Sequence, residues 1–453
     1  MSTLRTKGWK TVLILAWPLI ISNAFWNLQL TIDRIFLGHL SPDALGAAIA
    51  SMGIFWVPMA LVQQTAGFVT TFVAQYRGAK QDDRVGQALW QSIYISVVGG
   101  LLFLFLIPVT PWLFSLFKHS PQLIELETSY FQALCYSALP TALVACASGF
   151  YTGIERTKII MRINGIGLVL NVLLDYIMIF GNWGCPALGV SGAGYATSIA
   201  GLGAAIYGFY KIFSPAYEKE FQVRTKWRPD TKLLWQFIKF GVPSGLQWSL
   251  EGLAFTCFLV FVGRMGSLEL SATGITITIM MLSILPAMGV AQAVMALVGK
   301  HVGERNFDQA QEYTWRGFEI VALYMTTLGI SFVVFPSFYM NWFYNGQDEL
   351  MWSQIQTVVP ILLLFVALFA LFDAVNLVLS FALKGAGDTH FVSQVVLVLP
   401  WPLMVIPTMF LVDVQHGLYW AWGAASLYIV TQAGFFLVRF IKGSWRSINM
   451  LQT

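Results

Sequence analysis

Long apolar stretches alternate with mostly short polar loops along the whole chain, and this pattern predicts membrane-spanning helices. A helix that crosses the hydrocarbon core of a bilayer needs about 20 mainly apolar residues. Twelve such stretches occur, at about 11–37, 44–73, 88–116, 128–153, 161–181, 189–212, 233–262, 270–298, 314–343, 352–383, 390–412 and 417–440. The sequence therefore predicts an all-α integral membrane protein with twelve transmembrane helices.

The positions of the basic residues predict the orientation of these helices. Loops on the cytoplasmic side of membrane proteins carry an excess of Lys and Arg. If the N-terminus lies in the cytoplasm and the spans alternate, 23 of the 26 basic residues fall on the cytoplasmic side. Only Arg34, Lys118 and Arg264 then fall outside. We therefore expect a multi-pass protein of the cell (inner or plasma) membrane with both termini in the cytoplasm.

An internal repeat divides the chain into two halves. A shift of 225 residues places Pro18 on Pro243, Gly38 on Gly263, Leu45 on Leu270, Gly78 on Gly303 and Asp83 on Asp308. Six spans return the chain to the side from which it started, so both halves have one orientation and are related by a pseudo-two-fold axis along the membrane normal. The predicted organisation is an N-lobe at 1–213 (spans 1–6), a cytoplasmic inter-lobe linker at 214–232 and a C-lobe at 233–453 (spans 7–12).

Composition excludes several classes of function. The chain is 57% hydrophobic and 11% charged, whereas soluble domains are about 25% charged. The net charge of +4 follows from the cytoplasmic loops and does not indicate nucleic-acid binding. No phosphate-binding loop, zinc-binding HExxH motif or catalytic triad occurs, so an enzyme is not expected. We expect a monomer in the lipid bilayer that needs no cofactor beyond a coupling ion.

Two acidic residues in the first half stand within predicted spans. Ionisable groups inside a membrane are costly, and they indicate function unless they only fix helices through buried hydrogen bonds. Asp33 lies in the first span, and Asp175 follows Asn171 by one helical turn. Thr197 lies in a glycine-rich run of the sixth span. If these helices converge, Asp33, Asn171, Asp175 and Thr197 form a cluster of oxygens that suits shared protons or a cation such as sodium.

The second half does not repeat these acids. Asp33 corresponds to Phe258 with the shift of 225 residues, and further along the chain Asp175 corresponds to Leu403 with a shift of 228. The intramembrane acids of the second half are Glu251 and Asp373. The polar content of the two halves therefore differs on one repeated scaffold. This difference predicts that one lobe binds the coupling ion and that the other helps to hold a substrate.

Aromatic and amide side chains share helix faces with these acids. Trp26 and Gln29 precede Asp33 at helical spacing. In the second half, Gln247 and Trp248 precede Glu251 in the same way. An aromatic face near a carboxylate attracts organic cations, so these residues are candidates for substrate contact, with plain packing as the alternative.

Two prolines at matching repeat positions precede the intramembrane acids. Proline removes a helical hydrogen bond and bends the helix. Pro18 and Pro243 are therefore the candidate hinges at which these two helices bend.

Several segments together resemble the multidrug and toxic compound extrusion (MATE) family. They are Pro18 through Asp33-Arg-Ile-Phe-Leu-Gly38, Asn171-Val-Leu-Leu-Asp175, the Gly-Ala-Gly-Tyr-Ala-Thr197 run and Lys384-Gly-Ala-Gly-Asp-Thr389. The resemblance implies two six-helix lobes and antiport of cationic or amphiphilic compounds against protons or sodium. It also implies that the ion site of the DinF-like branch matches Asp33, Asn171, Asp175 and Thr197, and that the second-lobe acids of other branches match Glu251 and Asp373. A tyrosine of the NorM-like branch appears here as Phe369.

We therefore expect a secondary active multidrug efflux transporter that works by alternating access with proton or sodium antiport. Its partners would be small organic cations or amphiphiles. One alternative is a lipid-linked oligosaccharide or lipid flippase of related architecture, which needs a strongly basic central cavity. The other is a membrane-embedded enzyme or receptor, which needs a metal or nucleophile constellation.

Overall fold

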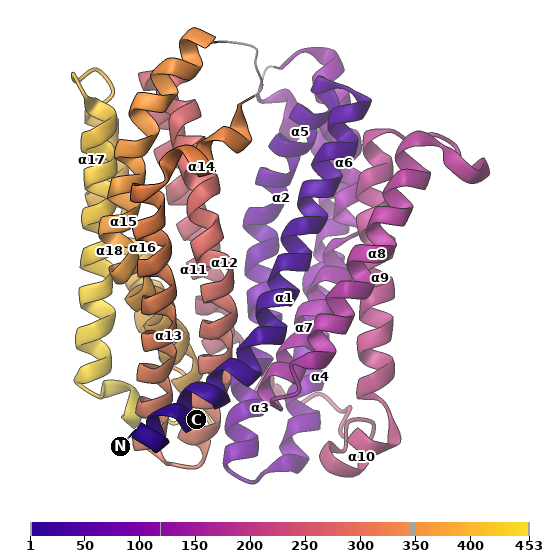
Figure 1. Ribbon diagram of the computed structural model, residues 1–453. Coiled ribbons are helices and arrows are strands. Elements are labelled where there is room, and N and C mark those ends of the chain that lie inside the picture. The colour runs from indigo at the N-terminus through magenta and orange to yellow at the C-terminus, as the bar shows by residue number, and fades with distance from the viewer. Residues whose placement is uncertain (1, 118, 345–348, 452–453) are drawn as a thin grey trace. The chain divides into compact units, whose positions relative to one another are not determined.

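The computed structural model describes residues 2–117, 119–344 and 349–451, and every regular element within these ranges is helical (Figure 1). The six predicted spans of the first half correspond to α1 (Ser2–Leu40), α2 (Pro42–Gly67) with α3 (Val69–Gly78), α4 (Asp82–Leu102) with η1 (Phe103–Val109) and α5 (Thr110–Ser115), α6 (Pro121–Cys135) with α7 (Ala138–Gly153), α8 (Lys158–Phe180) and α9 (Val190–Ile212). The short η2 (Asn182–Gly184) and α10 (Pro215–Phe221) complete this half.

The second half follows the same plan. Its spans are α11 (Thr231–Met265), α12 (Ser267–Gly303), α13 (Phe307–Val334), α15 (Glu349–Ala386), α16 (Thr389–Val398) with η4 (Trp401–Val405) and α17 (Ile406–Phe410), and α18 (Gly417–Ile441). The short elements are α14 (Pro336–Met340), η3 (Asn341–Phe343) and η5 (Ser444–Ser447). The predicted all-α fold is confirmed.

The lengths of these helices agree with a multi-pass membrane protein. Within the described ranges, ten helices are long and apolar enough to cross a membrane, and the pair α6 and α7, bent by 43°, makes an eleventh. Helix α9 occupies the remaining predicted span and is rich in glycine. Three of the spans bend or change helix type near a proline: 88–116 near Pro108, 128–153 near Pro140, and 390–412 near Pro400.

Contacts divide the chain into two compact units, which we describe separately. The N-terminal unit contains Ile21–Ser249, Gly299–Asn306 and the chain from Asn449. The C-terminal unit contains the chain up to Ile20, Leu250–Val298 and Phe307–Ile448. The first and eleventh helices each belong in part to both units, so these units do not coincide with the lobe boundaries at 213 and 233 that the repeat predicts.

Specific contacts account for this division. In the C-terminal unit, the indole Nε1 of Trp9 on α1 donates a hydrogen bond of 2.6 Å to Glu319 on α13. In the N-terminal unit, the hydroxyl of Ser249 on α11 donates a bond of 2.7 Å to the carbonyl oxygen of Val57 on α2. Both Pro18 and Pro243 lie inside continuous helices, so neither proline ends its helix.

The predicted inter-lobe linker at 214–232 packs on the N-terminal unit. Its helix α10 buries Phe221, and the guanidinium of Arg77 lies 5.2 Å from the centre of that ring. The indole of Trp90 on α4 donates a hydrogen bond of 2.7 Å to the carbonyl oxygen of Val223. The linker is therefore an ordered part of this unit.

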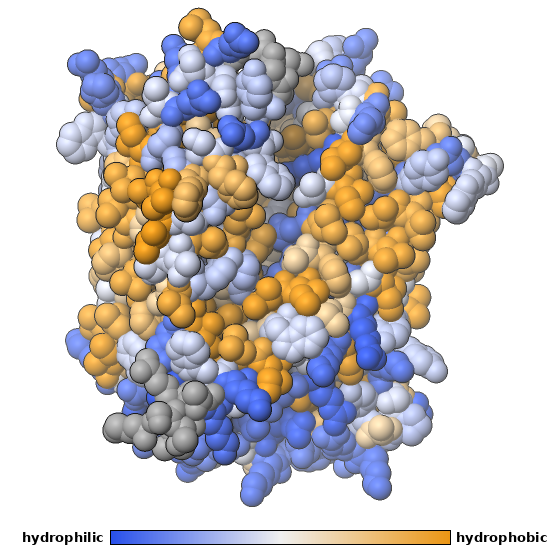
Figure 2. All heavy atoms as spheres, viewed as in Figure 1, coloured by the Kyte–Doolittle hydropathy of each residue, from blue (hydrophilic) through white to orange (hydrophobic). Residues whose placement is uncertain are grey.

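Each unit has its own hydrophobic core and an apolar outer surface. Phe55, Phe114 and Phe131 are buried in the N-terminal unit, and Phe258 and Leu362 are buried in the C-terminal unit. Figure 2 shows hydrophobic residues over the outer faces of α8 and α9, and hydrophilic residues around α10 in the same unit. An apolar face of this kind is the surface that a helix presents to lipid.

Candidate functional site

Close packing of α8 against α9 positions the acidic cluster of the N-terminal unit. A Cβ at Gly192 on α9 would lie 2.6 Å from the carbonyl oxygen of Met178 on α8, and a Cβ at Gly203 would lie 2.6 Å from Leu170. Glycine at these positions lets the two backbones approach each other. The glycine-rich run that the sequence showed is therefore the surface by which α9 packs on α8.

The four residues predicted for the ion site lie together within the N-terminal unit. In the amide orientation that satisfies its neighbours, the Asn171 nitrogen donates to Asp33 Oδ1 at 2.7 Å and to Asp175 Oδ2 at 3.1 Å. The other amide atom lies 3.4 Å from Thr197 Oγ1, and that hydroxyl donates to the carbonyl oxygen of Ala193 at 3.0 Å. One amide therefore bridges two carboxylates and contacts the predicted threonine.

Both carboxylates of this cluster are removed from solvent. Asp33 is 4% exposed, and Asn171 and Asp175 are 0% exposed. Asp33 and Asp175 interact directly through their side chains, while Asp175 Oδ1 is buried without a hydrogen-bond donor among the described residues. Two carboxylates that share one amide donor provide oxygens for a proton or a cation.

The sequence analysis did not identify one residue of this cluster, Tyr130, nor a second polar contact between α1 and α8. The buried Tyr130 on α6 interacts electrostatically with both Asp33 and Asp175. The amide of Asn164 on α8 donates a hydrogen bond to the Ser22 hydroxyl on α1. Asn164 lies seven residues before Asn171, on the same helix face, so its spacing could have identified it. Tyr130 carries no such signal, because no spacing within its own helix relates it to Asp33 or Asp175.

An aromatic pair lies on the same helix as Asp33. Trp26 is 38% exposed, and its ring lies 5.2 Å from the ring of Trp56 on α2, with an angle of 39° between the planes. Gln29 lies between Trp26 and Asp33 and is partly buried. Trp56 was not predicted, because it reaches Trp26 only through the packing of α2 against α1.

The C-terminal unit holds a different polar cluster. Glu251 on α11 interacts electrostatically with Asp373 on α15. Tyr428 on α18 is buried and interacts electrostatically with Glu251 and Asp373. The buried Lys384 supplies a positive charge that acts on Glu251. The structure therefore brings the two predicted acids of this half together, with a tyrosine and a lysine that were not predicted for this site.

Two other residues predicted to line the cavity, Gln247 and Trp248, do not belong to the C-terminal unit. Gln247 and Trp248 are part of α11 but belong to the N-terminal unit, whereas Glu251 belongs to the C-terminal unit. Gln247 is 5% exposed, and its amide oxygen is buried without a hydrogen-bond partner in the described part of the chain. The shared helix face that the sequence predicted therefore spans the boundary between the two units.

The position that corresponds to Asp33 is apolar in the second half. Phe258 is 1% exposed, and its ring lies 6.5 Å from Trp422. Phe369, which replaces the tyrosine of the NorM-like branch, is 3% exposed in the same core. The repeated scaffold thus holds an acidic cluster in one half and hydrocarbon at the matching place in the other.

Comparisons with known proteins agree with the predicted family. A family model, MatE, matches residues 18–177 and 243–409. A probable multidrug resistance protein NorM from Thermotoga maritima is 26% identical over 449 residues, which cover 98% of this chain and 94% of that protein. A protein of the same name from Xylella fastidiosa is 25% identical over 399 residues, which cover 87% of this chain and 83% of that one.

Solved structures share the fold over nearly the whole chain. A crystal structure of MATE in the bent conformation superposes with a TM-score of 0.86 at 20% identity, covering 98% of this chain and 97% of that one. A MOP superfamily transporter from Pyrococcus furiosus superposes with a TM-score of 0.88 at 19% identity, with the same coverage. Because the family model matches both repeats, this chain belongs to the MatE family, the multidrug and toxic compound extrusion family, and is a membrane transporter rather than an enzyme.

Proposed function

We propose that this protein is a secondary active efflux transporter that exports small cationic or amphiphilic molecules in exchange for protons. Its relatives bear the name of multidrug resistance proteins. The observation that carries the proposal is the pair Asp33 and Asp175, which is buried and bridged by the single amide of Asn171.

Electrostatic repulsion between the two carboxylates favours the binding of a proton or a cation. Both carboxylate oxygens contact one nitrogen, so they lie within about 6 Å of each other. At that separation two unit charges repel by about 3 kcal/mol at an effective dielectric constant of about 20. One bound proton or cation removes this repulsion, and the unpartnered Asp175 Oδ1 is an oxygen on which a proton would lie.

The two neighbouring carboxylates favour protons over sodium, because repulsion between them increases their affinity for a proton. With no cation bound, hydrogen bonding to both carboxylates turns the Asn171 nitrogen inward and its oxygen towards Thr197. Sodium at this place would need the amide oxygen turned inward as a ligand, because hard cations are bound by oxygen. A proton on either carboxylate requires no such rearrangement. Sodium at the same four residues is the second candidate, as the resemblance to the DinF-like branch implies.

The substrate would contact the aromatic residues on the same helix. Trp26 and Asp33 are seven residues apart on one face of α1, which corresponds to about 10 Å along the helix axis. The ring pair of Trp26 and Trp56 offers aromatic faces to an organic cation. Neutralising the nearby carboxylates weakens the electrostatic hold on such a cation. Ion and substrate would therefore compete although they occupy different residues.

Alternating access would follow from that competition. A ligand shifts a conformational equilibrium only by its different affinities for the two states. We propose that protonation of the pair favours the state that releases substrate outside, with α1 and α11 bending at Pro18 and Pro243. In the C-terminal unit, Glu251 and Asp373 would help to hold the substrate.

The same proposal includes the arrangement in the membrane. The protein is a multi-pass protein of the plasma membrane, and the concentration of basic residues in alternate loops supports cytoplasmic termini. A monomer contains both halves of the repeat and therefore both polar clusters. The flippase alternative lacks support, since Arg34 and Arg264, its candidate basic residues, are both exposed at the ends of helices.

Transport by purified protein in liposomes tests this function. Wild type should export a cationic dye faster when an inward proton gradient is imposed, and an ionophore that collapses the gradient should remove the stimulation. Asp33→Asn and Asp175→Asn should each lose that stimulation. Asp43→Asn, which removes an exposed carboxylate at the start of α2, is the matched control and should keep it.

Either of two results would overturn the assignment. Gradient-stimulated export by both buried-site variants at the wild-type rate would exclude this pair as the coupling site. Stimulation by a sodium gradient alone, at constant pH, would replace the proton with sodium at the same residues.

A further inference from the structure

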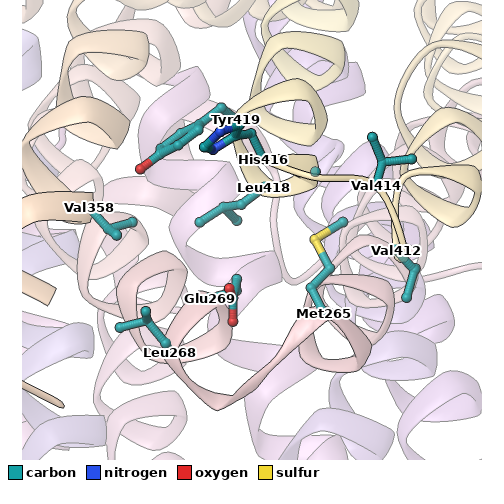
Figure 3. Close-up of a pocket in the computed structure, with 10 residues that line it drawn as sticks. Met265, Leu268, Glu269, Val358, Val412, Val414, His416, Leu418 and Tyr419 are labelled. Carbon is teal, nitrogen blue, oxygen red and sulfur yellow. The ribbon is translucent and has the colours of Figure 1, made fainter. Parts of the chain in front are cut away.

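A second place for a ligand lies in the C-terminal unit, apart from Glu251 and Asp373. It is a pocket of about 210 Å³ between the end of α11, the start of α12 and the segment that joins α17 to α18. Figure 3 shows Glu269 and Met265 on one side of this pocket, with His416, which directly precedes α18, and Tyr419 on α18 above them, and Val414 to the right of His416.

The side chains around this pocket combine one carboxylate with aromatic and apolar groups. The rings of His416 and Tyr419 are stacked, with centroids 6.1 Å apart and an angle of 25° between their planes. The Glu269 side chain is half-buried, and Met265 contributes a polarizable thioether. A carboxylate next to an aromatic face attracts an organic cation and repels an anion.

Local backbone geometry holds the carboxylate in this place. Gly266 has a φ of 157°, which a residue with a side chain rarely adopts. The Glu269 carboxylate lies over Gly266, and a Cβ at Gly266 would be 2.3 Å from Glu269 Oε2. The turn between α11 and α12 therefore places this charge beside the pocket.

The internal repeat shows that the scaffold does not require these residues. With the repeat offsets, Glu269 corresponds to Ala44, which is 1% exposed in the hydrophobic core of the N-terminal unit. Tyr419 corresponds to Ser191, and His416 to Leu188. The corresponding turns of the first half thus form without a carboxylate or an aromatic ring at these positions, although Asp43 stands next to Ala44. The combination of one carboxylate with two rings is specific to the second half.

We propose that this pocket binds the ammonium group of an organic cation, with Glu269 as its counter-charge and Tyr419 as its aromatic wall. Sites for whole drug-sized molecules have volumes of about 300–1,000 Å³, so the pocket accommodates a charged head group and leaves the rest of the molecule outside. The inference rests on the proposed function for one source of the cation, an exported substrate. An amine-bearing lipid head group supplies the same chemistry.

Protection of a single cysteine tests the pocket directly. Val414 lines the pocket and is 47% exposed, so Val414→Cys would report on its occupancy. The full chain, with its four natural cysteines replaced, is placed in phosphatidylglycerol nanodiscs. The rate of maleimide labelling is then measured against the concentration of benzyltrimethylammonium.

The expected result is that the cation slows labelling, and that Glu269→Gln raises the half-protecting concentration about three- to ten-fold. Glutamine keeps the length and hydrogen-bonding capacity of glutamate in the first turn of a helix, so this variant removes only the charge. Tyr419→Leu should weaken protection similarly. Asp413→Asn, which removes an equal charge from the exposed loop without lining the pocket, should change the concentration less than about two-fold.

A second membrane distinguishes the two sources of the ammonium group. In phosphatidylethanolamine nanodiscs, slow labelling without added cation that Glu269→Gln accelerates would assign the site to the lipid head group. The proposal is overturned if Glu269→Gln changes labelling in neither membrane, or if Asp413→Asn weakens protection as strongly. Because the assay needs no gradient, protection that survives Asp33→Asn separates this site from the transport mechanism.

Discussion

Replacing Asn171 by leucine should destabilise the protein more at high pH than at low pH. The amide donates two hydrogen bonds, of 2.7 and 3.1 Å, to the buried Asp33 and Asp175. A hydrogen bond to a charged group contributes about 1.5–3 kcal/mol, and one between neutral groups contributes about 0.5–1.5 kcal/mol. Asn171→Leu should therefore cost about 2–4.5 kcal/mol when one carboxylate is ionised and the other keeps its proton, and about 1–3 kcal/mol when both are protonated.

The free energy of unfolding, titrated with a denaturing detergent at pH 5 and pH 9, measures this difference. The matched control is Asn164→Leu on the same helix, because that amide donates to the uncharged Ser22 hydroxyl. The control should lose about 1 kcal/mol at both pH values. An equal loss for Asn171→Leu at both pH values would refute the bridging role of the amide.

Three further predictions concern helix packing, substrate contact and one ion pair. Gly192→Val should destabilise the protein and abolish export, because its Cβ would lie 2.6 Å from a backbone oxygen, whereas Gly53→Ala, with open space around it, should be neutral in the same thermal-unfolding and transport assays. Trp56→Ala should weaken binding of a cationic dye about three- to ten-fold in a fluorescence titration, while a neutral dye binds unchanged. Asp388→Asn should cost about 1.5–3 kcal/mol of unfolding free energy, because it removes the buried charge that pairs with the partly exposed Arg439, 2.7 Å away. In a double-mutant cycle, adding Arg439→Gln should then cost little more, and additive losses would contradict this account.

Periodicity and charge distribution predicted most of the fold, because both follow from the thickness and polarity of the bilayer. The changes in helix geometry near Pro108, Pro140 and Pro400 were not predicted in detail, since a proline inside an apolar run is compatible with either a bend or a break. The distribution of α1 and α11 between two units was also not predicted. That division depends on contacts such as Trp9 with Glu319, which join residues far apart in the chain.

For the candidate site too, the sequence predicted relationships within one helix but not contacts between helices. Asn171 and Asp175 were recognised because one helical turn separates them. Tyr130 and Trp56 were missed, because they approach the site from neighbouring helices with no polar spacing of their own. In the second half, Tyr428 joins Glu251 by the same kind of long-range contact.

Counting the protons released when a cationic substrate binds is the most direct test of the central claim, that ion and substrate compete through Asp33 and Asp175. The measurement is calorimetric titration of purified protein in sodium-free buffers of different ionisation enthalpies. The account predicts that wild type releases protons on binding and that Asp33→Asn and Asp175→Asn release almost none. Equal release by wild type and both variants would contradict it.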